Sequence, residues 1–353
     1  MRIHRISILL AFSCILFSTI TFASTTMFIN KFNLNTENQL KDNFNPVIND
    51  FWEKNARANR FLGVDDKEIY TVSIKNNNQN AIVLSQGRNE NALKYKELAF
   101  ELDQQGYDLY LIDHRGQGFS QRLGGDNYRG HVEHFQDYVD DLDQYVSSLD
   151  LPSTYQNSYL LSHSMGGTIA ALYLEQFKHP FTAAVFFSPM FSINLGIPEK
   201  VAKILTYSSA KVCNWFSNKP CYIFSGHDYR KTPFAENHVT SSRIRFNSST
   251  QTFEDNPQAQ LGSPTMHWVS QSITACQQAI ENANKINIPI LVIQAGADQV
   301  VTSKGQKQFI TNATFYEDNR LINIPNAQHE ILLEQDQYRM PALNSTLEFL
   351  TSH

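Results

Sequence analysis

The sequence predicts an α/β protein in which a mostly parallel sheet has helices on both faces and carries an inserted, mainly helical cap. Three observations predict this fold class. Short apolar runs alternate with amphipathic segments from about residue 68 to residue 187. The alternation stops over residues 190–286, which are rich in Ser, Asn, Thr and His. It resumes at residue 287, so we expect one sheet domain interrupted by one structured insertion.

The expected strands are short apolar runs. The first alternates apolar and polar residues, as a half-exposed strand does, and the others are of the buried type. These strands are Glu68–Lys75, Ala81–Ser85, Asp108–Ile112, Tyr159–Leu161, Ala183–Phe187, Ile288–Gln294 and Leu321–Ile324. Apolar residues at helical spacing predict helices over Asn91–Gln105, Phe135–Leu149 and Thr168–Gln176. Residues 25–65 are polar, and there we expect only a helix or an extended lead-in around Pro46–Asn59.

The composition bounds the class of protein. The 353 residues are 42% hydrophobic and 18% charged, which allows a substantial core and argues against general disorder. The net charge is −5 and no basic cluster is present, which excludes a nucleic-acid binder. Cysteines and histidines lack the spacing of a structural zinc site. We expect no metal, no cofactor and no obligate protein partner.

Residues 1–23 have the pattern of a secretory signal peptide. Arg2 and Arg5 precede the apolar run Ile6–Phe22, and Thr21 and Ala23 offer small side chains at the −3 and −1 positions of a cleavage site. We therefore expect export to the periplasm or to the medium. An uncleaved membrane anchor is the alternative, because the apolar run nearly spans a bilayer.

The expected organisation is a signal peptide at 1–23, the first part of the sheet domain at 24–189, the cap at 190–286 and the second part of the sheet domain at 287–353. In an oxidising compartment, Cys213 and Cys221 are suitably spaced for a disulfide. Three reduced, buried thiols, with Cys276 as the third, fit the sequence equally well.

The segment Ser162–Gly167, with the sequence S-H-S-M-G-G, carries the chemistry. It lies between an expected strand and an expected helix, which is the context of a nucleophile elbow with Ser164 at its tip. The residues two before and two after the nucleophile must be small. Gly166 satisfies one side, and Ser162 stands where glycine is usual. An ordinary Gly-rich turn is the alternative.

A serine nucleophile needs a general base, and the base needs an orienting acid. Asp298 and His329 follow the last two expected strands, at the strand ends where open α/β sheets place ligands. The order Ser164, Asp298, His329 is that of an elbow-type serine hydrolase. Taken singly, Asp298 also fits a turn residue and His329 a loop histidine.

An oxyanion hole needs two backbone N–H groups, and the candidates are those of Met165 and Arg88. Arg88 follows the strand Ala81–Ser85. The alternative is that Gly87 only makes a turn and the Arg88 side chain faces solvent. A further hypothesis is that the Arg88 guanidinium meets an anionic head group. Asp113 is followed by two glycines, and we expect it to fix a tight loop by hydrogen bonds rather than to act as a second acid.

These motifs resemble the lysophospholipase L2 and monoacylglycerol lipase branch of the α/β-hydrolases. The turn D-H-R-G-Q-G-F-S at 113–120 resembles the branch motif D-x-R-G-x-G-x-S, and H-S-M-G-G at 163–167 resembles its elbow. The match to the lysophospholipase L2 group extends to G-R-N-E at 87–90, H-V-E at 131–133, F-Q-D-Y-V at 135–139, S-P-M-F at 188–191, G-S-P-T at 262–265 and H-W at 267–268.

The resemblance implies an α/β-hydrolase fold, a triad of Ser164, Asp298 and His329, and a cap that helps to choose the substrate. It implies hydrolysis of lysophospholipids with release of a fatty acid. Alternatives are a monoacylglycerol lipase, a generic carboxylesterase or acyltransferase, and a non-catalytic lipid-binding protein. The expected partner is a lysophospholipid or monoacylglycerol substrate, with contact to a membrane surface left open.

Many aromatic residues lie in or near the cap. They are expected either to line an acyl-chain tunnel or to form the core of the cap itself. They are Phe191, Tyr207, Trp215, Phe216, Tyr222, Phe224 and Trp268.

Overall fold

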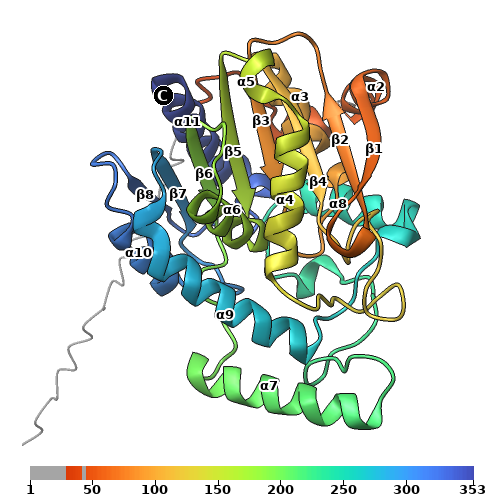
Figure 1. The fold of residues 1–353 in the computed structure, drawn as a ribbon. Helices are drawn as coiled ribbons and strands as arrows, with labels where there is room; N and C mark the ends of the chain where they lie inside the picture. Colours follow the sequence, from red (N-terminus) through yellow and green to blue (C-terminus); the bar gives the residue numbers. More distant parts are fainter. Residues whose placement is uncertain (1–28, 42–44) are drawn as a thin grey trace, which may run out of the picture.

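A computed structural model describes residues 29–41 and 45–353, so the expected signal peptide lies outside the described residues. Within them, one sheet has the strand order β1-β2-β4-β3-β5-β6-β7-β8 (Figure 1). β1–β2 and β2–β4 pair antiparallel, and all pairs from β4 to β8 are parallel. The strands are β1 Ala56–Leu62, β2 Glu68–Ile74, β3 Asn80–Ser85, β4 Tyr107–Asp113, β5 Asn157–His163, β6 Ala183–Phe187, β7 Ile290–Ala295 and β8 Arg320–Ile324.

Helices cover both faces of the sheet. Successive residues of a strand point to opposite faces, so Ala81 and Val83 of β3 pack with α4, α6, α9 and α10, whereas Ile82 and Leu84 pack with α2, α3 and α11. The predicted fold class is confirmed. The helices are α1 Glu37–Gln39, α2 Asn45–Asn55, α3 Lys96–Gln104, α4 Gln136–Ser148, α5 Leu151–Thr154, α6 Met165–Gln176, α7 Glu199–Phe216, α8 Arg243–Asp255, α9 Met266–Asn282, α10 Ser303–Asn312 and α11 Asp336–Ser352.

Short 3₁₀ turns join several of these elements. One of them begins the expected helix 91–105, so that this segment is η3 followed by α3. The turns are η2 Val64–Asp66, η3 Ala92–Tyr95, η4 Phe234–Glu236, η5 Pro257–Ala259, η6 Ala283–Lys285 and η7 Ile331–Leu333. None of the helices in the described ranges is long and apolar enough to cross a bilayer.

Strand β1 is the strand that the sequence did not reveal, and the helices α10 and α11 were not predicted either. Strand β1 is an edge strand whose central residues are exposed, so its sequence A-R-A-N-R-F-L lacks an apolar pattern. Helix α6 begins at Met165, three residues before the expected start, because the glycines of the elbow already lie in its first turn.

Between β6 and β7 the described chain forms helices and no strand of the sheet, which agrees with a helical insertion. The exact domain boundaries stay a prediction. Helix α9 packs against α6 and α10, and α7 packs on the outer side of α9, farthest from the sheet (Figure 1).

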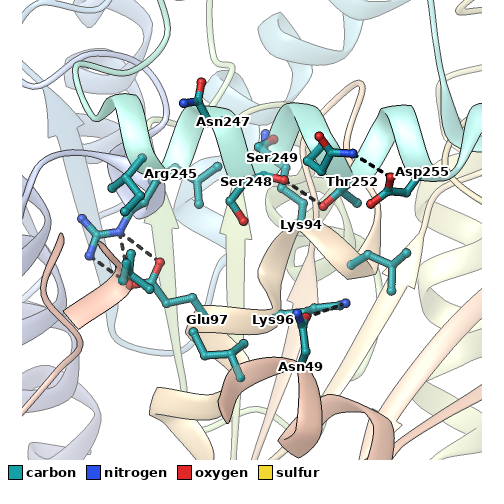
Figure 2. A pocket seen from close by; sticks show the side chains of 16 residues that line it. Asn49, Lys94, Lys96, Glu97, Arg245, Asn247, Ser248, Ser249, Thr252 and Asp255 are labelled. Atoms are coloured by element: carbon teal, nitrogen blue, oxygen red, sulfur yellow. Dashed lines mark hydrogen bonds and ion pairs between the residues drawn. The ribbon is translucent and has the colours of Figure 1, made fainter. Parts of the chain in front are cut away.

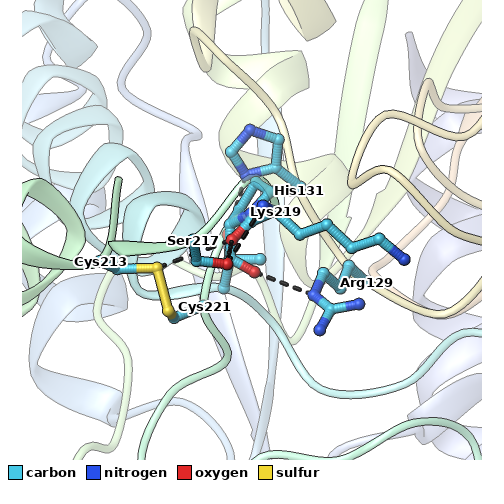
Figure 3. The surroundings of a disulfide bond; sticks show 8 residues. Arg129, His131, Cys213, Ser217, Lys219 and Cys221 are labelled. Atoms are coloured by element: carbon cyan, nitrogen blue, oxygen red, sulfur yellow. Dashed lines mark hydrogen bonds between the residues drawn. A yellow bond between two sulfur atoms is a disulfide. The ribbon is translucent and has the colours of Figure 1, made fainter. Parts of the chain in front are cut away.

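The structure joins Cys213 to Cys221 in a disulfide, and Cys276 is free and buried (Figure 3). The disulfide alternative is therefore confirmed for this pair, and the reduced alternative is wrong.

Candidate active site

Ser164 lies at the tip of the turn between β5 and α6. Its backbone has φ 51° and ψ −118°, a conformation that L-residues rarely adopt. The turn is held because the Ser164 carbonyl accepts a hydrogen bond from Met190 N at 2.9 Å. A Cβ on Gly166 would lie 2.1 Å from Ser85 O, and one on Gly167 would lie 2.6 Å from the Pro189 Cβ. Only glycine fits these two positions, so the sequence G-G is what allows the turn.

The serine at position 162 does not prevent the elbow. Ser162 is fully buried in β5, between Ser85 of β3 and Phe186 of β6 in the register of the sheet. Its small side chain is accommodated there, close to the Val185 carbonyl.

The three predicted site residues meet at the carboxyl ends of β5, β7 and β8. Ser164 Oγ lies 2.8 Å from His329 Nε2, and His329 Nδ1 lies 2.7 Å from Asp298 Oδ2. Ser164 is 7% exposed and His329 is 5% exposed. The other oxygen of Asp298 accepts hydrogen bonds from Val300 N and Val301 N, at 2.8 and 3.0 Å. Asp298 is thus both a turn residue and the partner of His329, which were alternatives at the sequence level.

The two expected oxyanion donors flank this group. Met165 directly follows Ser164, and Arg88 lines the same cavity as Ser164. Across the described part of the chain, neither the Met165 N–H nor the Arg88 N–H donates to a protein acceptor. No acceptor within the described residues therefore competes with a ligand for these two donors.

The Arg88 side chain does not face solvent. Its guanidinium lies 5.4 Å from the ring centre of Trp268 and donates a hydrogen bond to the Gly262 carbonyl. The buried Nε has no partner, and no carboxylate forms an ion pair with Arg88, among the described residues. Burial lowers the pKa of Arg88 to about 10.

A buried charged cluster beside Ser164 was missed at the sequence level. Glu90 Oε1 lies 3.0 Å from His163 Nδ1 and 2.9 Å from Lys94 Nζ, and Lys94 Nζ also lies 2.7 Å from Glu330. Burial alone would raise the pKa of Glu90, but Lys94 and His163 hold it well below its usual range. The i, i+4 spacing of Glu90 and Lys94 was the available signal.

This cluster touches both sides of the site. Glu90 Oε2 accepts hydrogen bonds from the Gly87 N–H and from the Tyr95 hydroxyl. His163 Nε2 lies 3.2 Å from the carbonyl oxygen of His329. The loop that holds Arg88 and the loop that holds His329 are thus connected through buried side chains.

Asp113 has the structural role that we predicted. One carboxylate oxygen accepts from Ala92 N at 2.8 Å and from Gln86 Nε2, and the other accepts from Phe119 N at 2.9 Å. These bonds fix the turn after β4 and the loop after β3. Burial raises the pKa of Asp113 to about 7.

A cavity of about 640 Å³ reaches Ser164 and His329 from between the core and the cap. Its apolar wall is formed by Met190, Ile193, Leu195, Ile223, Val239, Phe246, Phe253, Leu261, Trp268, Val269, Val300 and Val301. Part of its polar lining, which includes the exposed Arg230, Glu236 and His238, comes from the insertion. An apolar chain and a polar head group both find matching surfaces here.

The expectation for the aromatic residues is largely wrong. Of the seven, Trp268 lines the cavity, and Phe191 is buried against Phe309 with ring centres 3.9 Å apart. Trp215 and Phe216 are 84% and 83% exposed, so they form neither a tunnel nor a core.

A second cavity of about 450 Å³ lies between α8 and the α2–α3 region (Figure 2). Lys94 and Arg245 line it, but Ser164, Asp298 and His329 do not. We therefore place the candidate active site in the larger cavity. Within the described ranges, no group of three or more His, Cys, Asp or Glu side chains is arranged to hold a metal ion.

The chain is similar in sequence to proteins of a known hydrolase family. The family model described as "Serine aminopeptidase, S33" (Hydrolase_4) matches residues 76–336. The chain belongs to this family. It is 35% identical over 315 residues to lysophospholipase L2 of Escherichia coli K12, covering 87% of this chain and 90% of that protein. It is 34% identical over 269 residues to probable lysophospholipase L2 of Haemophilus influenzae, covering 76% and 83%.

Solved structures show the same fold. A monoglyceride lipase from Saccharomyces cerevisiae has a TM-score of 0.64 at 18% identity, with 84% of this chain and 94% of that chain covered. Family and relatives together identify the chain as a carboxylic ester hydrolase with an α/β-hydrolase fold.

Proposed function

We propose that the protein hydrolyses the acyl ester of lysophospholipids through an acyl-enzyme on Ser164 and releases a free fatty acid. The observation that carries this proposal is the continuous hydrogen-bonded chain from Ser164 Oγ through His329 to Asp298, in a cavity with an apolar wall. The similarity to two proteins named lysophospholipase L2 supports the substrate class.

In the proposed mechanism, His329 Nε2 accepts the proton of Ser164 as Oγ attacks the ester carbonyl. Asp298 holds the ring so that Nδ1 donates to it, and stabilises the imidazolium that forms. The N–H groups of Met165 and Arg88 stabilise the oxyanion. His329 then returns its proton to the leaving alcohol. Water attacks the acyl-enzyme with the same base, which regenerates Ser164 and frees the fatty acid.

Arg88 favours a lysophospholipid over a monoacylglycerol. A half-buried guanidinium whose Nε is buried, and which has no carboxylate partner in the described structure, carries an uncompensated charge beside the cavity. The phosphodiester of a lysophospholipid supplies the missing negative charge, whereas a monoacylglycerol is neutral. We extend the proposal to export of the protein through residues 1–23, which brings the site to extracytoplasmic lipid.

The test is fatty-acid release from lysophosphatidylethanolamine and from monoolein by the purified protein. Ser164→Ala should lower turnover by about 10⁴-fold or more. Undiminished release by this variant would reject Ser164 as the nucleophile. Activity on monoolein alone would instead favour a monoacylglycerol lipase.

Arg88→Met tests the head-group assignment, because it keeps the backbone N–H and removes the guanidinium. The ratio of kcat/KM for lysophosphatidylethanolamine to that for monoolein should fall by about tenfold or more, as for loss of a charge-assisted hydrogen bond. An unchanged ratio would show that Arg88 serves only to join the loop to Gly262.

A further inference from the structure

Helix α7 exposes an unusual amount of apolar surface. It contacts α9 with one face, on which Ala202, Ala210 and Cys213 are buried. Six large apolar side chains on the remaining surface are between 46% and 84% exposed: Val201, Ile204, Leu205, Val212, Trp215 and Phe216. Single exposed apolar residues are ordinary, but a contiguous set on one helix marks an interaction surface. Together these six residues are called the α7 face.

The helical rotation of about 100° per residue groups these residues on one side. They fall within an arc of about 120°, opposite the face that packs on α9. Lys200 and Lys211 lie on one flank of this arc, whereas Lys203 lies on the side of the helix that faces α9. Lys203 donates to Gln277 and Lys211 lies over the Tyr207 ring, but none of the three forms an ion pair with a carboxylate among the described residues. The helix is thus basic on a chain whose net charge is −5.

The carboxyl end of α7 is fixed in place. The disulfide joins Cys213 to Cys221 (Figure 3). The following Tyr222 forms a β-bridge with Thr265 at the start of α9. Arg129 also donates to the Pro220 carbonyl at 2.9 Å. Trp215 and Phe216 lie within the loop that the disulfide closes, so covalent and hydrogen bonds hold them at the edge of the cap.

We propose that the α7 face is a docking surface for anionic phospholipid bilayers, with the helix lying in the plane of the interface. An apolar arc flanked by lysines, with a tryptophan near one end, is the pattern of an interfacial helix. The lysine flank complements an anionic lipid surface, whereas a neutral protein groove would give it no partner. The inference goes beyond the proposed hydrolysis, because binding depends on α7 and not on Ser164.

Tryptophan fluorescence gives a direct readout. The chain has three tryptophans, and Trp52 and Trp268 are only 8% and 4% exposed. Trp215 is 84% exposed, so a blue shift on adding vesicles reports mainly its transfer into lipid. The experiment uses the exported, processed protein, with its N-terminus verified by mass spectrometry so that no apolar leader contributes. We expect a blue shift and co-sedimentation with phosphatidylcholine–phosphatidylglycerol vesicles, and much weaker binding to phosphatidylcholine alone.

Substitutions in the α7 face and in its flanking lysines test whether vesicles bind there. Co-sedimentation of Ile204→Ser/Trp215→Ser should weaken by about tenfold or more, because both side chains would otherwise be buried in lipid. Lys200→Glu/Lys211→Glu should weaken binding by about fivefold or more per lysine and reduce its salt dependence. The matched control is Phe315→Ser, which removes an apolar side chain that is 58% exposed outside the cap and should bind as the wild type does.

Two outcomes would overturn the inference. One is unchanged vesicle binding by Ile204→Ser/Trp215→Ser. The other is a wild-type protein that does not bind vesicles but forms a dimer, seen by light scattering, which this variant abolishes. The α7 face would then be a contact between subunits. Hydrolysis of a short, soluble ester by the variant should stay within about twofold of wild type. Failure of docking is thereby distinguished from failure of the proposed hydrolysis.

Discussion

Two buried charged clusters, one centred on Lys94 of η3 and the other on Glu97 and Glu101 of α3, differ in the parts of the molecule that they connect. The first, the site cluster, is built on a lysine and a histidine and contacts the loops of the candidate active site. The second, the brace cluster, is built on two arginines. The site cluster is Glu90, Lys94, Tyr95, His163 and Glu330; the brace cluster is Glu97, Glu101, Arg245, Asp336 and Arg339.

The brace cluster joins elements that are distant in sequence. Arg245 of α8 pairs with Glu97 of α3, as Figure 2 shows, and with Asp336 of α11. Arg339 pairs with Glu101 and donates to the Leu332 carbonyl at 2.8 Å. Guanidinium groups stay charged at all ordinary pH values, which suits a permanent brace. The site cluster uses groups that titrate or reorient, next to the atoms proposed to react. The two clusters should therefore fail in different ways.

The largest effect is expected for Arg339→Met in the brace cluster. Arg339 is fully buried, and its loss leaves Glu101 without its buried counter-ion and Glu97 with Arg245 alone. We expect the free energy of unfolding to fall by about 3–5 kcal/mol, with nearly normal turnover by the protein that remains folded. Urea denaturation monitored by circular dichroism measures this change.

The control for Arg339→Met is Lys31→Met, which breaks an exposed ion pair with Glu348 and should cost less than about 1 kcal/mol. Equal losses for the two variants would show that burial of the brace adds nothing.

The next largest effect is expected for Glu90→Gln, and it should appear in turnover rather than in the free energy of unfolding. The variant loses the carboxylate that accepts a hydrogen bond from the Gly87 N–H and pairs with Lys94 and His163. The loop that carries the proposed oxyanion donor is then less well held, and kcat should fall by about 10²-fold with little change in KM. Glu101→Gln is the matched change in the brace cluster. If both variants lose stability and keep kcat, the site cluster is only another brace.

The sequence predicted the parts of the fold and site that are recorded locally. Buried strands are apolar runs, and Ser164, Asp298 and His329 each follow such a run, so their order and positions could be inferred from the chain. The edge strand β1 escaped because its residues are exposed and polar. The site cluster escaped because Glu90 meets His163 and, through Lys94, Glu330 only in the folded sheet.

For two aromatic residues of the cap, the sequence predicted burial where the structure shows exposure. Apolar composition predicted burial for Trp215 and Phe216. Their exposure depends on which face of α7 packs against α9, and no property of the helix sequence alone specifies that choice.

The smallest and most specific effect is a pH dependence that only the site cluster should show. Burial alone would lower the pKa of His163, but Glu90 raises it above the ordinary value, while Lys94 partly opposes this and Glu330 assists. A raised folded-state pKa means that stabilisation by protonated His163 is fully present below the unfolded value of about 6.5. It is lost as the pH rises through the folded value.

Replacing His163 by Asn should therefore cost more stability at about pH 6 than at about pH 9. Urea denaturation of wild type and variant at both pH values measures it. A cost that is the same at both values would mean that His163 is neutral in the folded protein and serves only as a hydrogen-bond partner. The cost of Arg339→Met should not fall as the pH rises, because the guanidinium stays charged over this range and burial, which raises the pKa of Glu101, favours the neutral carboxyl at the lower pH. The pair of variants thus separates a cluster whose stabilisation is lost as the pH rises from one whose stabilisation is kept.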